Sequence, residues 1–190
     1  MYQRELRLAG VSIPSAYSSD ALQRVAKILA FTGFTAVGAQ LAVPLPFTPV
    51  PITMQTLFVV LAGMTLGARD GFYAMLSYLA LGSSGAPVFA GFSFGPAPLF
   101  GPTGGYLIAF PAAAALSGYL VERLGNDRGR AFLAAACGMA LILVSGAAYL
   151  MLLSGAPFGR IAAMAVFPFM AGEILKAVCA AGLAGRSRRD

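Results

Sequence analysis

Glu173 and Lys176 are two charged residues in the stretch AGEILKAVC, inside the last long apolar run of the chain. An ionisable side chain near the middle of a membrane span costs roughly 2.5–3.5 kcal/mol on insertion scales, and it usually faces the interior of a helix bundle. Residues three apart on a helix share a face, so this carboxylate and ammonium can pair and offset most of that cost. The spacing therefore predicts a buried ion pair that either fixes helix register or stays charged in order to hydrogen-bond a ligand.

The rest of the sequence is typical of an integral membrane protein. Of its 190 residues, 58% are hydrophobic and only 11% are charged, and the mean hydropathy is +0.79. A soluble domain of this length carries far more charge. We therefore expect an all-α membrane protein with six transmembrane helices, of which the last is kinked at Pro168. The expected spans are residues 21–43, 53–67, 70–84, 104–123, 131–154 and 161–184.

The chain divides into three parts by composition. Residues 1–20 are a polar lead-in, residues 21–185 form the six-helix membrane domain, and residues 186–190 are a basic tail. Both the lead-in and the tail are expected on the cytoplasmic side.

The basic residues predict this orientation. Eleven of the thirteen Lys and Arg residues share one side of the six spans, whereas Arg160 falls on the other side and Lys176 lies within a span. The eleven are Arg4, Arg7, Arg24, Lys27, Arg69, Arg123, Arg128, Arg130, Arg186, Arg188 and Arg189. Because cytoplasmic loops carry the excess of Lys and Arg, we expect a multi-pass protein of the cell (inner) membrane with both termini and residues 126–130 in the cytoplasm. Residues 45–52, 85–103 and 156–160 are then outside.

Several kinds of chemistry are excluded by composition. The chain contains no His, so neither a zinc hydrolase site nor a Ser-His dyad is expected, and we predict no metal, no cofactor and no catalytic residue. Cys137 and Cys179 fall in different expected spans and are interpreted as small packing residues. No GxxxxGK[ST] motif is present, so ATP-driven work would come from a partner. The basic residues are not interleaved with aromatics as nucleic-acid binding would require.

Two loops on the expected outer side are rich in Pro and Gly. The first, VPLPFTPVPITMQT, holds Pro44, Pro46, Pro49 and Pro51, which favour extended or turn backbone. The second, GSSGAPVFAGFSFGPAPLFGPTGGY, has no charge, and its aromatic side chains would be exposed to water unless the segment folded over a cavity. We therefore expect the second loop to form an apolar lid.

These motifs, in this order, resemble the BioY family of biotin-binding S components of energy-coupling factor (ECF) transporters. The resemblance rests on PLPFTPVPITMQTLFVVLAG, GAPVFAG, GPTGGYLIAFP and GEILK, and it covers roughly residues 30 to 180. It implies a six-helix protein in the lipid bilayer that captures biotin from outside and works with a T component and two ATPase subunits. Glu173 stands where the family often has Asp, which keeps the charge and lengthens the side chain by one methylene.

The resemblance also implies positions for the substrate and the partner. The implied substrate-binding residues are Gln55, Phe89, Gly91, Gly104, Gly105, Tyr106, Glu173 and Lys176. Ala26 and Ala30 belong to a series of small residues four apart in the first span, and such spacing lets helices approach closely in lipid. They resemble the Ala-rich face on which the T component docks in the family, and packing within the same subunit is the alternative for any one pair.

Two other functions would also use an intramembrane carboxylate. Glu173 and Lys176 could be the acid/base pair of an intramembrane enzyme, although no nucleophile or metal set accompanies them. Glu173 could instead carry protons in a self-sufficient secondary transporter for biotin or a similar small vitamin, although the chain shows no convincing inverted repeat. The sequence favours the binding component over both alternatives.

Overall fold

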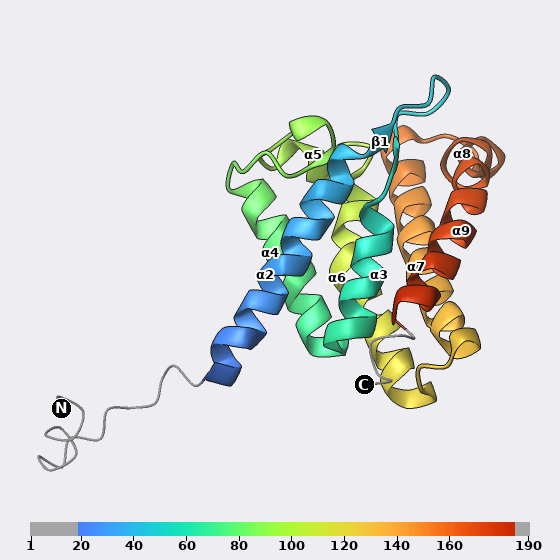
Figure 1. Ribbon diagram of the computed structural model, residues 1–190. Coiled ribbons are helices and arrows are strands. Elements are labelled where there is room, and N and C mark those ends of the chain that lie inside the picture. Colours follow the sequence, from blue (N-terminus) through green and yellow to red (C-terminus); the bar gives the residue numbers. More distant parts are fainter. Residues whose placement is uncertain (1–18, 185–190) are drawn as a thin grey trace, which may run out of the picture.

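The computed structural model describes residues 19–184 and consists mostly of helices (Figure 1). The expected lead-in and basic tail lie almost wholly outside these residues. The elements in chain order are α2 (Ser19–Gln40), β1 (Ala42–Val43), β2 (Ile52–Thr53), α3 (Gln55–Leu66), α4 (Ala68–Ser83), η1 (Ala90–Phe92), α5 (Ala97–Phe100), α6 (Gly104–Leu124), α7 (Arg128–Ser154), α8 (Phe158–Ala165) and α9 (Phe167–Ala184). The prediction of an all-α protein is confirmed, with one two-stranded hairpin as an addition among the described residues.

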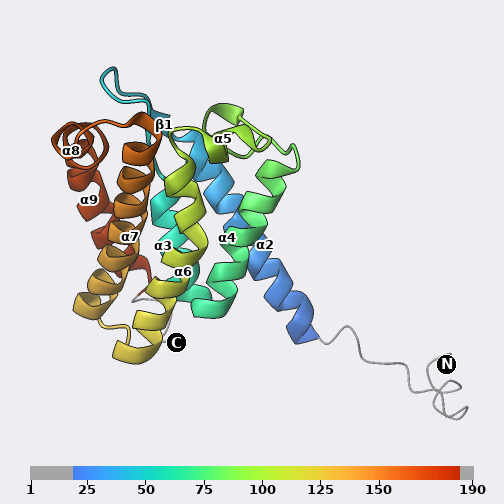
Figure 2. The same ribbon diagram turned by 180° about the vertical axis from the view of Figure 1, so that it is seen from behind.

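The long helices form a bundle whose connections gather at two ends. The β1–β2 hairpin, η1, α5 and α8 lie at one end, which we call the lid end, and α2 begins and α9 ends at the opposite, basic end (Figure 1). Viewed from behind, α6 lies between α7 and α4 and contacts both (Figure 2). By length and composition, α6, α7 and α9 can each cross a bilayer.

Glycines bring the backbones of α3, α4 and α6 into direct contact. A Cβ atom on Gly118 would lie 2.5 Å from the backbone nitrogen of Ala68 and 2.7 Å from the carbonyl oxygen of Gly63. A Cβ atom on Gly71 would lie 2.6 Å from the Cα atom of Gly63. Because dispersion and shape dominate helix association in lipid, this small-residue seam fixes the centre of the bundle.

Helix α3 is short because the chain enters it from the hairpin. Its 12 residues span about 18 Å, less than the roughly 30 Å of a hydrocarbon core. Ala42 pairs with Thr53 in the hairpin, and the N–H of Met54 donates to the carbonyl oxygen of Gly38 at 3.1 Å. Pro49, Val50, Pro51 and Thr53, which precede α3, line a cavity of the bundle.

The sixth expected span is two helices, α8 and α9, and not one helix kinked at Pro168. The break lies at Val166, which has φ −124° and ψ −65°. Pro168 follows in the first turn of α9, where a missing N–H removes no helical hydrogen bond. The carbonyl oxygen of Ala165 instead accepts a hydrogen bond from the hydroxyl of Tyr106, 3.1 Å away. Pro168 therefore lies in the first turn of a new helix and does not kink a continuous one.

Candidate functional site

A cavity of about 270 Å³ lies at the lid end of the bundle. Its walls come from the hairpin, the first turn of α3, the η1 region, α6, α7 and α9, and most of the lining side chains are apolar. The lining residues are Pro49, Val50, Pro51, Thr53, Gln55, Thr56, Phe89, Ala90, Ser93, Pro98, Thr103, Tyr106, Leu107, Phe110, Met139, Ile142, Leu143, Phe169 and Glu173. Sites for small molecules are typically mostly apolar cavities with a few polar groups, so this one suits a small and largely apolar ligand.

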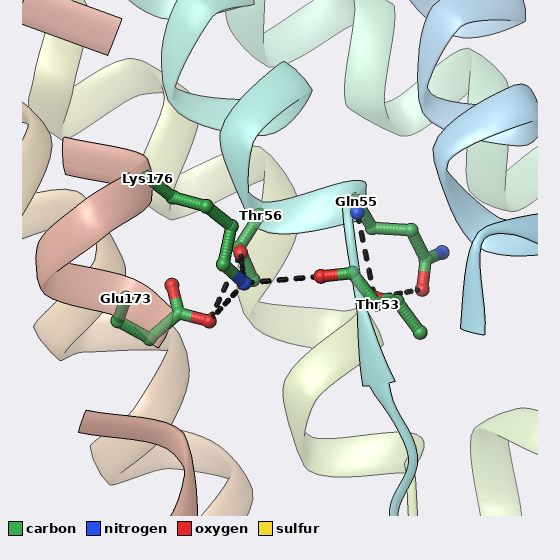
Figure 3. A network of polar contacts seen from close by, with 5 residues as sticks. All are labelled: Thr53, Gln55, Thr56, Glu173 and Lys176. Carbon is green, nitrogen blue, oxygen red and sulfur yellow. Dashed lines mark hydrogen bonds and ion pairs between the residues drawn. The ribbon is translucent and has the colours of Figure 1, made fainter. Parts of the chain in front are cut away.

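Glu173 supplies a carboxylate to one wall of the cavity, and its ion pair with Lys176 lies against the start of α3 (Figure 3). The ammonium of Lys176 also donates to the carbonyl oxygen of Thr53 at 3.0 Å and to the hydroxyl of Thr56 at 2.7 Å. Lys176 therefore has three acceptors for its three N–H groups, and it is 5% exposed.

The carboxylate of Glu173 has a hydrogen-bonding atom without a partner among the described residues, unlike the ammonium of Lys176. Its Oε1 atom accepts from Lys176 and from the hydroxyl of Thr56, which is 3.1 Å away. Its Oε2 atom is buried and has no hydrogen-bond partner among the described residues. A buried polar atom without a partner is costly, so this oxygen is the natural acceptor for a donor on a ligand.

Gln55 connects the same turn of chain to the lid. Its amide oxygen accepts from the hydroxyl of Thr53 at 3.1 Å, and its amide nitrogen donates to the hydroxyl of Tyr78 at 2.6 Å. The Tyr78 hydroxyl in turn donates to the carbonyl oxygen of Val88 at 3.0 Å. Gln55 therefore lines the cavity. It also donates to the hydroxyl of Tyr78, which is itself hydrogen-bonded to the lid at Val88.

Phe89 closes the lid side of the cavity. The side chain is 1% exposed, and its ring meets the ring of Tyr78 edge to face, with centroids 5.5 Å apart. The ring lies directly over Gly82, where any Cβ atom would collide with it. The expectation of an apolar segment folded over a cavity agrees with the placement of Phe89, but it is wrong for Phe92, Phe94 and Phe100, whose side chains are exposed.

The three glycines implied by the resemblance lie outside the lining of the cavity. Gly91 is exposed and has a φ of +67°, and a Cβ atom there would meet nothing within 4 Å in the described part of the chain. Gly104 packs against the carbonyl of Leu99, and Gly105 packs against α7 through Tyr149. These glycines shape the lid and the contact between α6 and α7. Of the eight implied substrate residues, those that line the cavity are Gln55, Phe89, Tyr106 and Glu173.

The comparisons with known proteins agree with this architecture. The model of the BioY family matches residues 10–190. The chain belongs to the BioY family.

Similar proteins are named as biotin transporters. The chain is 41% identical over 164 residues to "Probable biotin transporter BioY" of Pyrococcus horikoshii. The aligned residues make up 86% of this chain and 95% of the relative. It is 40% identical over 160 residues to "Biotin transporter BioY" of Rhizobium etli, which covers 80% of this chain and 84% of the relative. A crystal structure of the S-component for biotin from an ECF-type ABC transporter superposes with a TM-score of 0.84 and 26% identity, over 93% of this chain and 96% of that one.

The BioY match and the apolar helices together identify a membrane protein. Its relatives are transporters, and no catalytic activity is indicated. The sequence prediction of the BioY family is therefore confirmed.

Thr53 and Thr56 are site residues that the sequence analysis missed. Both fall in the quoted stretch PVPITMQT, so the motif contained them, but a threonine at the start of an apolar helix carries no signal of its own. Thr56 and Lys176 are 120 positions apart in the chain. Only the fold shows that these hydroxyl and carbonyl groups meet the ion pair on α9.

The small residues of α2 divide into exposed and buried sets. Ala26 and Ala30 are exposed, and neither lines the cavity. Thr32 and Thr35 are buried, and the hydroxyl of Thr32 donates to the carbonyl oxygen of Ala74 in α4 at 2.9 Å. Ala26 and Ala30 therefore lie on an exposed face of α2, whereas Thr32 and Thr35 pack within the chain.

Proposed function

We propose that this BioY protein binds biotin in the cavity at the lid end and takes it up as the S component of an ECF transporter. The observation that carries the proposal is a mostly apolar cavity with the carboxylate of Glu173 on its wall, one oxygen of which has no partner among residues 19–184. The names of the relatives and of the similar crystal structure supply the identity of the ligand.

The chemistry of biotin suits this arrangement. Its ureido ring carries two N–H donors and a polarised carbonyl group, and its thioether ring and aliphatic tail are apolar. Glu173 would accept from a ureido N–H, and the rings of Phe89, Tyr106 and Phe169 would pack against the apolar parts. Lys176 would donate to the ureido carbonyl or to the ligand's carboxylate once it releases one of its present acceptors.

The three glycines have an indirect part in this proposal. Gly91 permits the backbone turn of the lid, and Gly104 and Gly105 permit the close approach of α6 to its neighbours. They would shape the biotin site without touching the ligand through side chains.

We further propose that the protein lies in the cell (inner) membrane with six spans and both termini in the cytoplasm. The basic end carries two arginines over tyrosine rings, with Arg69 5.9 Å from the ring centre of Tyr73 and Arg123 5.4 Å from that of Tyr119. Tyrosine is enriched at membrane interfaces, and an excess of Lys and Arg marks the cytoplasmic side. Arg160, in contrast, lies in α8 at the lid end.

The partners in this proposal are a T component and two ATPase subunits, with the T component docked on α2. Ala26 and Ala30 are exposed there, and small residues four apart allow close packing of a partner helix. The energy of ATP hydrolysis would come from the two ATPase subunits.

An equilibrium titration of the purified protein with biotin, desthiobiotin and thiamine tests the choice of ligand. We expect saturable binding of biotin, weaker binding of desthiobiotin, which lacks the thioether, and no binding of thiamine, whose ring is cationic. Equal binding of thiamine, or no binding of biotin, would contradict the proposed function.

Transport by this chain alone is the second candidate, because Glu173 places a carboxylate inside the bundle where a proton could bind. Proteoliposomes that contain only this protein, with a pH gradient and no ATP, separate the two candidates. Biotin accumulation under those conditions would favour the secondary transporter. A requirement for ATP and co-reconstituted partners would favour the S component.

A further inference from the structure

Two side chains from the helical bundle hold the lid by its backbone. On one side, the hydroxyl of Tyr78 donates to the carbonyl oxygen of Val88. On the other side, Gln40 uses both halves of its amide: the nitrogen donates to the carbonyl oxygen of Phe89 at 3.1 Å, and the oxygen accepts from the N–H of Phe92 at 3.0 Å. The last residue of α2 therefore brackets the η1 turn.

The turn that Gln40 brackets is not one that the chain favours by itself. Phe92 has a φ of +57°, and it is the one non-glycine residue with positive φ among residues 19–184. Left-handed backbone is disfavoured for a residue with a bulky side chain and persists where its surroundings enforce it. The Phe92 ring is exposed, so packing supplies little of that support. The hydrogen bond from its N–H to Gln40 supplies support directly.

The bracketed turn is the part of the lid that faces the cavity. Phe89, Ala90 and Ser93 all line the cavity, whereas Gln40 does not. The N–H of Phe89 donates to the carbonyl oxygen of Ser93 at 3.1 Å, so a backbone hydrogen bond closes this segment on itself. Release of Gln40 would therefore loosen this part of the cavity wall, which Tyr78 still holds through Val88, without removing any side chain that lines the cavity.

We propose that Gln40 acts as a latch: the two hydrogen bonds of its amide hold the lid closed and so limit the rate at which a bound ligand dissociates from the cavity. For a ligand to leave past residues 89–93, this turn must move away from the cavity. Both hydrogen bonds of the Gln40 amide would then have to break. Gln40 is thus a positioning residue that acts on the ligand through Phe89. The inference rests on the proposed function, since it takes biotin to be the occupant of the cavity.

The variant Gln40→Met tests the latch. Methionine keeps the length and helix propensity of glutamine but provides neither the amide donor nor the amide acceptor. The matched control is Gln23→Met, a second glutamine on α2 that is exposed and lies beside Arg24 and Asp70 at the far end of the helix. Both proteins are purified at full length and compared with wild type.

Two measurements are made on each protein. The first is the rate at which labelled biotin dissociates into excess unlabelled biotin, and we expect Gln40→Met to raise it at least fivefold. The second is hydrogen exchange of the ligand-free protein, read by mass spectrometry on peptides that cover residues 88–95. We expect faster exchange there and unchanged exchange in α6 and α7, with the thermal midpoint close to that of wild type. Gln23→Met should match wild type in both measurements.

The outcomes separate the latch from the proposed function. Unchanged exchange in residues 88–95 overturns the latch, as does faster exchange with an unchanged dissociation rate, because the lid would then not be on the exit path. Faster exchange throughout the bundle with a lower thermal midpoint also overturns it and gives Gln40 a general structural role. If wild type binds no biotin, the proposed function fails, and the exchange data still report whether Gln40 holds the lid.

Discussion

Lys176 on α9 donates a hydrogen bond to the backbone carbonyl oxygen of Thr53, 3.0 Å away at the end of β2. The side chain of Thr53 donates to Gln55, Gln55 donates to Tyr78, and Tyr78 donates to the carbonyl oxygen of Val88 in the lid. One hydrogen-bonded chain therefore runs from the ion pair to the lid. A change in the ion pair on ligand binding therefore has a physical route to the lid.

Lys176→Met and Glu173→Gln are each expected to weaken biotin binding at least tenfold, which corresponds to about 1.4 kcal/mol. Glu173→Gln replaces a charged acceptor by a neutral one, and hydrogen bonds to charged groups are the stronger kind. Lys176→Met removes the partner that orients the carboxylate. Titration of each variant with biotin measures the effect.

Stability must be separated from binding in these variants, because the removal of one partner leaves a buried charge alone. Removal of one partner of a buried ion pair typically lowers the free energy of unfolding by about 3–5 kcal/mol. The double variant Glu173→Gln/Lys176→Met removes both charges, so its ligand-free thermal midpoint should recover while biotin binding stays weak. Wild-type affinity in both single variants would assign the pair a purely structural role.

Thr56→Val is expected to weaken biotin binding about tenfold and to lower the ligand-free thermal midpoint. Valine keeps the shape of threonine, but the hydroxyl that accepts from Lys176 and donates to Glu173 is lost. A hydrogen bond to a charged group contributes about 1.5–3 kcal/mol, and part of that loss should appear in binding because Thr56 also lines the cavity. Thr56→Ser keeps the hydroxyl and should bind nearly as wild type. Equal affinities of the Val and Ser variants would show that the hydroxyl has no part in binding.

The helices were predictable from the sequence because long apolar runs separated by Pro, Gly and charge leave few other arrangements. The long helices agree with the expected spans to within a few residues, apart from the division of the last span. The position of the break at Val166 was not predictable from the sequence. Pro168 indicates only the region of the break, whereas the hydrogen bond from Tyr106 to the carbonyl oxygen of Ala165 helps to determine where the helix is interrupted. That bond joins two spans and leaves no local pattern in either.

The site was predictable only in part, for a similar reason. Glu173 and Lys176 stand out because charge is rare in apolar runs, whereas Thr53, Thr56 and Gln40 are ordinary helix-end and loop residues in the sequence. Their importance depends on which distant groups they meet. Gly104 and Gly105 show the converse, because their place in a recognisable motif suggested ligand contact while the fold places them against neighbouring backbone.

Gly105→Ala should destabilise the protein more than Gly91→Ala. A Cβ atom on Gly105 would collide with Tyr149 and lie 2.8 Å from the carbonyl oxygen of Ser145, so α6 and α7 would have to separate. Gly91 has open space around it, and alanine there incurs mainly the cost of left-handed backbone, about 1 kcal/mol. Thermal unfolding without ligand compares the two. A larger loss of stability in Gly91→Ala would contradict this account of the α6–α7 contact.

The proposed orientation predicts which engineered cysteines react from outside the cell. In a background of Cys137→Ala and Cys179→Ala, Gly159→Cys at the lid end should react with a membrane-impermeant maleimide in intact cells. Arg128→Cys at the basic end should react only after the membrane is opened. Both positions are exposed in the structure, so accessibility to water does not differ between them. Reaction of residue 128 in intact cells would overturn the orientation.

Replacement of Ala26 and Ala30 by Trp should abolish co-purification with a T component and leave biotin binding intact. Both residues are exposed, and a Cβ atom on Gly33, one turn further along α2, would meet nothing within 4 Å among the described residues. Two indole rings would prevent the close helix approach that small residues allow. The matched control is Ile108→Trp, an exposed position on α6, which should retain the partner. Loss of the partner in both proteins would show a general effect of added bulk, and loss of biotin binding in the α2 variant would mean that this face supports the fold from within.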